Sequence, residues 1–378
     1  MKDVNLISEL KLRSSYGVNA NQGISNFAAR GLFGSGYDYD SQPGYIQTQF
    51  ANNNLTWEEN RPFNVGLDFG IFKDRISGTV EYYERSTTKL LLDVSASAIN
   101  GLTSYSDNYG SMKNSGIEVS LTTQNIQPGK TGGFSWKTDL NFSTLKNNIT
   151  GLVNPMTGTF NRTVGLDFYQ FYMVGYAGVD PQTGESLFYV DGSKSATTKD
   201  YTQAQRFNQG SALPKFFGGI TNSFSYKGVE LSFQFYMNWG NKLRNGWGTS
   251  QESDGGDKFS STGNVTRYTY ENRWQKPGDV TDVPRFLYGG PTAESSTRFL
   301  LDGSYIRLRD VSLAYTLPST FTKKFKTDKV RLYVRGNNLW TYIKDKRLIF
   351  DPEVPIEGNL DQRAPVYKTV LMGLDISF

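Results

Sequence analysis

Hydrophobic and polar side chains alternate along much of this chain, and its last segment shows the pattern most clearly. Residues 370–378 read VLMGLDISF, in which one set of alternate positions is apolar and the other set is mostly polar. The apolar set is Val370, Met372, Leu374, Ile376 and Phe378. Because successive side chains of a strand point to opposite faces, the segment is predicted to be a strand with one apolar side.

The same period of two recurs along the chain, and no segment shows the period of a long helix. In the predicted strand 304–317 the apolar positions change from even to odd numbers, which predicts a β-bulge near Asp310. The pattern predicts about ten strands, near residues 9–18, 61–72, 75–91, 114–124, 133–146, 214–226, 228–239, 304–317, 328–341 and 365–378.

The predicted connections alternate between short and long. The short ones are KD (73–74), NIQPGKTG (125–132), KG (227–228) and PSTFTKKFKT (318–327). The long ones are roughly 19–60, 92–113, 147–213, 240–303 and 342–364. Transmembrane β-barrels combine short periplasmic turns with long external loops, so the sequence favours an antiparallel barrel whose C-terminus is periplasmic.

A soluble sheet remains an alternative, because alternation fits any half-buried antiparallel sheet. Such a sheet needs a second layer over its apolar face, and a sandwich of two sheets would provide one. The regular alternation of connection lengths and the final aromatic ring favour the barrel. We interpret the apolar positions of 370–378 as the assembly signal of the outer-membrane insertion machinery, with the ring of Phe378 at the membrane–water interface.

Composition excludes several kinds of chemistry. The 378 residues include no cysteine and no histidine, which excludes disulfides, thiolate nucleophiles, zinc sites built on these residues and Ser-His-Asp triads. We expect no catalytic residues, no metal and no cofactor. The 40 basic and 36 acidic residues nearly balance, so no nucleic-acid partner is expected. No run of about 18 apolar residues and no signal-peptide core is present, and any export signal is expected outside the chain.

Two short motifs have competing interpretations. The segment GLFGSG (31–36) lacks the ending of a phosphate-binding loop and is interpreted as loop glycines. The segment GVDPQTGE (178–185) offers Asp180 and Glu185 to calcium, but its Pro-Gln-Thr-Gly sequence favours a tight turn.

Polar residues on the other strand face are expected to line water or a plug, and we expect oppositely charged neighbours to form ion pairs. They are Asp68, Glu81, Glu118, Lys137, Asp139, Glu230, Arg331, Arg335 and Asp375. Trp57, Trp247, Trp274 and Trp340 fall in or beside long connections, where rings could stack on sugars. Trp247 and Trp274 are the candidate ligand contacts, with loop packing as the equal alternative.

Eight stretches, in order along the chain, resemble the SusC/RagA-type TonB-dependent outer-membrane transporters. They include NLTWEENRPFNVGLDFGIFKDRISGTVEYYERSTTKLLL (54–92), GYAGVDPQTGE (175–185), DGSYIRLRDVSLAYTLP (302–318), VRLYVRGNNLW (330–340) and DPEV (351–354). The resemblance implies a 22-stranded barrel around an N-terminal plug. It also implies a SusD-like surface lipoprotein and the TonB complex as partners.

The chain resembles only the last ten strands of such a barrel, so residues 1–378 are expected to be its C-terminal part, without plug, TonB box or signal peptide. The implied function is import of oligosaccharides, or of peptides, across the outer membrane of a Gram-negative, Bacteroidetes-like cell, in contact with its lipid. The alternatives are a soluble or surface carbohydrate-binding β-protein, including a hydrolase that uses two carboxylates, and a passive ten-stranded pore.

Overall fold

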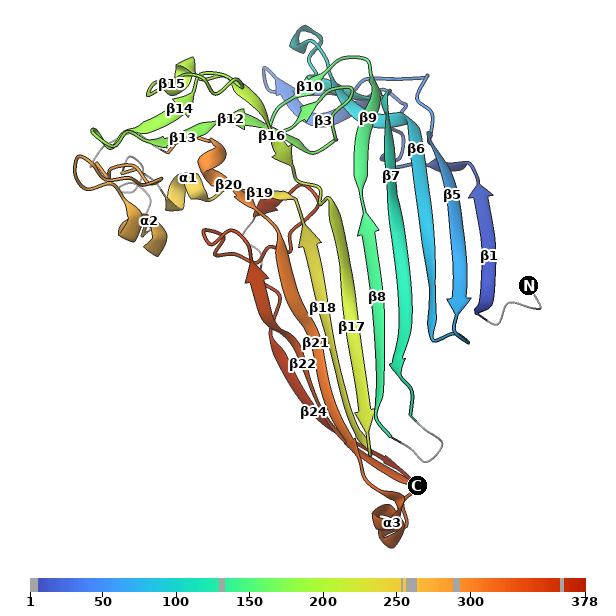
Figure 1. The fold of residues 1–378 in the computed structure, drawn as a ribbon. Helices are drawn as coiled ribbons and strands as arrows, with labels where there is room; N and C mark the ends of the chain where they lie inside the picture. Colours follow the sequence, from blue (N-terminus) through green and yellow to red (C-terminus); the bar gives the residue numbers. More distant parts are fainter. Residues whose placement is uncertain (1–5, 129–132, 253, 256–263, 288–292, 361–363) are drawn as a thin grey trace.

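One large antiparallel sheet dominates the computed structural model, which describes residues 6–128, 133–252, 254–255, 264–287, 293–360 and 364–378 (Figure 1). Ten strands follow one another through this sheet in chain order. They are β1 (Ile7–Tyr16), β5 (Glu58–Ile71), β6 (Ile76–Ser95), β7 (Ser104–Ile126), β8 (Ser135–Thr144), β17 (Phe216–Tyr226), β18 (Val229–Trp239), β21 (Tyr305–Thr316), β22 (Lys329–Ile343) and β24 (Thr369–Ser377). All ten predicted strands are confirmed.

The predicted β-bulge lies within one residue of its expected position. The register between β18 and β21 shifts between Gln234 and Phe235, which pair with Asp310 and Leu308, so Arg309 is the extra residue. The extra residue keeps the apolar side chains before and after it on the same face of the sheet.

The predicted long connection 92–113 is mostly strand. Strands β6 and β7 are 20 and 23 residues long, and they pair as far as Ser95 and Ser104 before a 3-10 turn at Ala98–Asn100. Register shifts on both sides of Leu90 interrupt the period of two, which explains why the sequence pattern ended the strand too early.

The remaining long connections form short strands and short helices at one end of the large sheet, the loop end (Figure 1). Their strands are β2 (Asn19–Asn21), β3 (Leu32–Tyr39), β4 (Gln42–Gln49), β9 (Lys146–Leu152), β10 (Met156–Thr157), β11 (Asn161–Arg162), β12 (Gln170–Val174), β13 (Tyr176–Val179), β14 (Ser186–Tyr189), β15 (Thr197–Thr198), β16 (Arg206–Ser211), β19 (Lys242–Asn245), β20 (Leu300–Asp302) and β23 (Asn359–Leu360). Their helices are α1 (Gly248–Gln251) and α2 (Arg267–Asn272). Two of the short strands pair with β5 and β7 of the large sheet, and the others form small separate sheets. No helix in the described ranges is long and apolar enough to cross a membrane.

The opposite end, the turn end, carries the short connections and the C-terminus (Figure 1). Lys227 and Gly228 both have positive φ, 45° and 86°, as a two-residue hairpin turn requires. The connection 318–327 forms α3 (Ser319–Thr322) and a 3-10 turn at Lys323–Phe325. Of the predicted turn 125–132, residues 129–132 lie outside the described residues.

The apolar face of the large sheet is open to its surroundings. Side chains directly opposite one another, such as Leu313 and Val334, keep 52% and 40% of their surface exposed. The two buried apolar clusters lie in the loop-end connections, and no second layer covers this face in the part of the chain described. The sandwich alternative therefore does not fit. The shortest of the ten strands still has nine residues, which is enough to span the hydrocarbon core when tilted.

Aromatic side chains lie at both edges of this apolar face. Exposed rings near the loop end are Tyr16, Phe63, Trp340 and Tyr342, and those near the turn end are Tyr226, Tyr315 and Phe378. The rows between them contain aliphatic pairs, such as Leu67 with Val80 and Leu140 with Ile220, and further rings such as Phe233 and Phe235. Two aromatic belts around an apolar band are the surface pattern of outer-membrane barrels.

Ion pairs within one strand, between adjacent strands and across an intervening strand lie on the opposite, polar face. Arg13 pairs with Asp68 at 3.2 Å and also with Glu81, crossing over Gly66. The expected pairing is confirmed for most of the predicted residues, through Lys137–Asp139, Arg331–Glu230, Arg331–Asp375 and Arg335–Asp310. Glu118 forms no ion pair with any residue in the described ranges.

Candidate functional site at the loop end

Three long connections, 145–215, 240–304 and 344–368, fold together over the loop end, and we call them the loop platform. One apolar cluster joins Phe171 and Met173 of the first connection to Leu300 of the second. Another joins Leu243 of the second to Leu348 of the third. The three connections therefore pack together above the ten long strands of the large sheet, which we call the strand wall.

Arg307 fastens the third connection to the strand wall. This β21 side chain is 2% exposed, and it donates hydrogen bonds to Asp351 at 2.6 Å and to Glu353 at 2.8 Å. Arg309 holds the same Glu353 carboxylate at 3.1 Å. This contact could not be predicted from the sequence, because periodicity gives no sign that segments about 45 residues apart come together.

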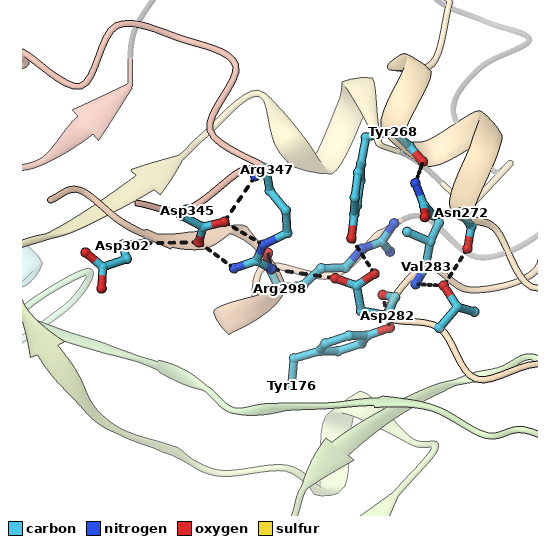
Figure 2. A network of polar contacts seen from close by, with 10 residues as sticks. Tyr176, Tyr268, Asn272, Asp282, Val283, Arg298, Asp302, Asp345 and Arg347 are labelled. Carbon is cyan, nitrogen blue, oxygen red and sulfur yellow. Dashed lines mark hydrogen bonds and ion pairs between the residues drawn. The ribbon is translucent and has the colours of Figure 1, made fainter. Parts of the chain in front are cut away.

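A polar network joins all three connections at Asp282 (Figure 2). The hydroxyl groups of Tyr176 and Tyr268 donate to the backbone carbonyl and the carboxylate of Asp282, at 3.0 and 2.7 Å. Arg347 approaches the same carboxylate at 3.8 Å and is held by Asp345 at 2.9 Å. Burial raises the pKa of both tyrosines, so both phenols stay protonated as donors.

A buried ion pair lies beside this network. Arg298 contacts Asp254 at 2.7 Å, and the two side chains are 5% and 8% exposed. Burial raises the pKa of Asp254, and the Arg298 guanidinium opposes that shift. A second guanidinium nitrogen donates to the Glu252 carbonyl at 2.8 Å. Because each charge is partnered, the pair holds the second connection in place despite its burial.

The largest cavity found in the described part of the platform has a volume of about 340 Å³. Phe188 and Tyr201 line it, with ring centroids 5.2 Å apart in an edge-to-face arrangement. Lys199, Arg285 and Glu185 also contribute to its wall. Aromatic surface beside charged groups suits a polar ligand that has apolar faces.

The tight turn predicted around Asp180 is confirmed. Its carboxylate accepts the backbone N–H groups of Gln182 and Thr183 at 2.8 and 3.3 Å, as an Asx-type turn requires. Lys199 bridges Asp180 and Glu185 at 2.8 and 2.7 Å. The Lys199 ammonium group lowers the pKa of Asp180 to about 2. The carboxylates that were considered as calcium ligands, Asp180 and Glu185, both contact this ammonium group.

The two candidate tryptophans have different surroundings. Trp274 is half-buried, donates from Nε1 to the Pro181 carbonyl at 3.0 Å and packs on Gly184, where an added Cβ would lie 2.4 Å from its ring. Trp247, just before α1, is 38% exposed. Neither residue lines the 340 Å³ cavity. The contact of these two residues with a ligand stays a prediction. Trp247 is the better candidate of the two, because its side chain is more exposed.

The proposed assembly signal lies on the outermost strand of the sheet. Val370, Met372, Leu374 and Ile376 pair with β22, and Met372 is 75% exposed. Phe378 follows the strand and is 88% exposed. Their role in assembly stays a prediction.

The GLFGSG motif contributes no chemistry to the platform. GLFGSG lies within and beside β3 of a hairpin, so it is strand rather than the predicted loop. In the described ranges, no group of three or more acidic side chains is arranged to hold a metal ion.

Comparison with known proteins gives consistent matches over the whole chain, although no protein-family model matches it. TonB-dependent receptor P3 of Formosa agariphila is 30% identical over 424 residues, covering 100% of this chain and 40% of the relative. TonB-dependent receptor SusC of Bacteroides thetaiotaomicron is 27% identical, covering 100% and 38%. The chain thus spans about two fifths of the length of these curated relatives.

Solved structures agree with the sequence relatives. The RagAB peptide transporter superposes with a TM-score of 0.84 at 28% identity, covering 100% of this chain and 42% of that chain. The open-open state of the RagAB peptide importer gives the same TM-score at 29% identity.

Proposed function

Because this chain is related over its whole length to the SusC/RagA-type TonB-dependent receptors and matches part of their β-barrel, we propose that it forms the C-terminal wall and external loops of an outer-membrane importer. The apolar face contacts lipid, the ion-paired face lines the lumen, and the loop platform faces the cell exterior. In this arrangement the C-terminus is periplasmic.

One observation carries the proposal: a single antiparallel sheet has an exposed apolar face between two aromatic belts and an ion-paired polar face behind it. Hydrocarbon is the environment that stabilises such a face without a second protein layer. Strands β1 and β24 each pair on one side only in the described structure. In the proposed barrel, strands outside this chain pair with these two edges.

The proposed ligand is an oligosaccharide or a peptide. The solved relative is described as a peptide transporter, and a curated relative is named SusC. The 340 Å³ cavity offers both ring surface and charged groups to such ligands. We propose a SusD-like lipoprotein as the external partner and the TonB complex as the source of energy, acting through a plug outside this chain.

The alternatives have less support. A soluble carbohydrate-binding β-protein would expose its apolar strand face to water, which is unfavourable over a surface of this extent. A passive ten-stranded pore requires β1 and β24 to pair with each other, and they do not pair in the described sheet.

Uptake by whole cells tests the proposal. Deleting the gene of the full-length protein is expected to abolish uptake of at least one labelled oligosaccharide or peptide from a panel, and restoring the gene is expected to recover it. The restored uptake should also stop when TonB is removed. Uptake that persists without TonB would contradict an energised importer and favour a passive pore.

A further inference from the structure

A second cavity, of about 110 Å³, lies where the first and second connections of the loop platform meet. Arg206 of β16 and Arg244 of β19 line it from two different sheets of the platform. Thr159, Tyr172 and Ser295 complete most of its wall. A water molecule needs roughly 10–15 Å³ of such space, so the cavity has room for a small polyatomic group.

The two arginines differ from the other arginines around them. Arg285, Arg298 and Arg347 of the same platform each hold a carboxylate. Arg206 and Arg244 make no side-chain hydrogen bond, ion pair or ring contact within the described residues. Arg206 is exposed and Arg244 is half-buried. Their planar sets of donors therefore have no side-chain partner among the described residues.

The remaining polar groups of the cavity are also donors without partners. The hydroxyl groups of Thr159, Tyr172 and Ser295 make no hydrogen bond to described residues. Among the described residues, no carboxylate lines the cavity. Glu294, next to Ser295, lines the larger cavity instead and forms no ion pair with either arginine in the described part of the chain.

We propose that Arg206 and Arg244 form an anion-binding site that takes a carboxylate or sulfate group of the imported ligand. Both groups present coplanar or closely spaced oxygens that guanidinium donors match in pairs, and the hydroxyl groups supply further donors. The inference rests on the proposed function for the source of the ligand. It narrows the substrate class to acidic oligosaccharides or to peptides that have a free carboxylate.

Calorimetry on the full-length protein, purified from the outer membrane in detergent, tests the site. The probes are tetragalacturonate, a sulfated carrageenan tetrasaccharide and N-acetyl-tetraalanine. Each is compared with its uncharged counterpart, which is the methyl ester, the desulfated sugar or the peptide amide. At least one anionic probe is expected to bind while its counterpart does not. Arg206→Gln and Arg244→Gln should each weaken that binding about tenfold, because each change removes one charge-assisted hydrogen bond.

Two further variants make the result specific. Arg206→Lys keeps the charge but loses the paired donors, so its affinity should lie between those of the parent and Arg206→Gln. Arg267→Gln removes the same charge from an 88% exposed side chain of α2, which pairs with Glu271, and should leave binding unchanged. The proposal is overturned if no anionic probe binds, if the Gln variants bind as the parent does, or if Arg267→Gln weakens binding equally. Because the purified protein needs no TonB, a failure of uptake would contradict the proposed function separately.

Discussion

At the scale of single residues, arginine pairing separates the side chains that hold the platform from those free to bind. A buried guanidinium is stable only beside carboxylates or carbonyl groups, and Arg298 and Arg307 both have them. Arg206 and Arg244 line a cavity and have no such partner among the described residues. This contrast in pairing, rather than arginine content, is the basis for the proposed anion site.

Arg307→Met is expected to loosen the third connection while leaving the strand wall intact. The change removes the guanidinium between Asp351 and Glu353 and leaves their charges facing an apolar group. Breaking a buried ion pair costs about 3–5 kcal/mol. We expect the lower end here, because the Glu353 side chain is 35% exposed. Hydrogen exchange in 346–360 of the full-length protein should accelerate accordingly.

Arg309→Met is the matched control for this prediction. Arg309 contacts only Glu353 of the same pair of carboxylates and is 33% exposed, so its loss should cost much less than the loss of Arg307. Equal acceleration of exchange in the two variants would show that burial of Arg307 does not anchor the connection.

Sequence patterning could predict cross-strand pairs but not the pairs within the platform. Glu230, Arg331 and Asp375 share a face because a period of two places them there. Arg331 reaches Asp375 on the adjacent strand and Glu230 across β21. Asp282, Arg347 and Tyr176 come from three connections without periodicity. Only tertiary packing brings them into contact.

At the scale of elements, β24 is an edge strand whose free side presents unpaired backbone groups. A soluble protein protects such an edge with charge, proline or a covering loop. Here the outward positions of β24 are apolar, and Leu374 is 54% exposed. The strand is therefore suited to pairing within a membrane rather than to ending a soluble sheet.

Deleting Phe378 from the full-length protein is expected to reduce its assembly in the outer membrane severalfold. The ring is 88% exposed beyond the last strand residue, so its loss removes almost no packing within the chain. The measurement is the amount of heat-modifiable, folded barrel in the outer-membrane fraction, relative to total protein.

Tyr315→Ala separates an assembly signal from a general contribution of the aromatic belt. Tyr315 lies in the same turn-end belt and is 38% exposed. If both variants lost folded protein equally, Phe378 would act only as a belt residue, and the terminal signal would be rejected.

Element positions were predictable where one face of a strand is uniformly apolar. That condition holds over most of the length of the ten long strands, with exceptions such as Thr138 and Asn222, and the bulge at Arg309 is visible in the pattern as a change of phase. The condition fails for the loop-end parts of β6 and β7, where register shifts around Leu90 break the alternation. It fails also for strands of two to five residues such as β12, which are too short to show a period.

At the scale of the whole molecule, the two faces of the sheet need different environments. In the described part of the chain, the apolar face has no protein layer over it, while most of the predicted charged side chains of the polar face form ion pairs. The ten long strands follow one another in chain order, and the chain matches a RagAB structure at a TM-score of 0.84. Both observations fit a barrel wall between lipid and a water-filled lumen. Adjacent residues of one strand should therefore tolerate charge very differently.

Ile220→Lys and Thr221→Lys form the test, because the two residues are neighbours near the middle of β17 and face opposite sides. Ile220 pairs with Leu140 and Phe235 on the apolar face, and Thr221 pairs with Asp139 and Gln234 on the polar face.

A lysine at position 220 would enter hydrocarbon near the midplane, at a cost of about 2–4 kcal/mol. A lysine at position 221 would meet the Asp139 carboxylate and water. Urea unfolding of the full-length protein in lipid vesicles should show this loss for Ile220→Lys and little change for Thr221→Lys. Equal stability of the two variants would mean that the apolar face does not contact lipid, because only a hydrocarbon environment makes the two faces so unequal.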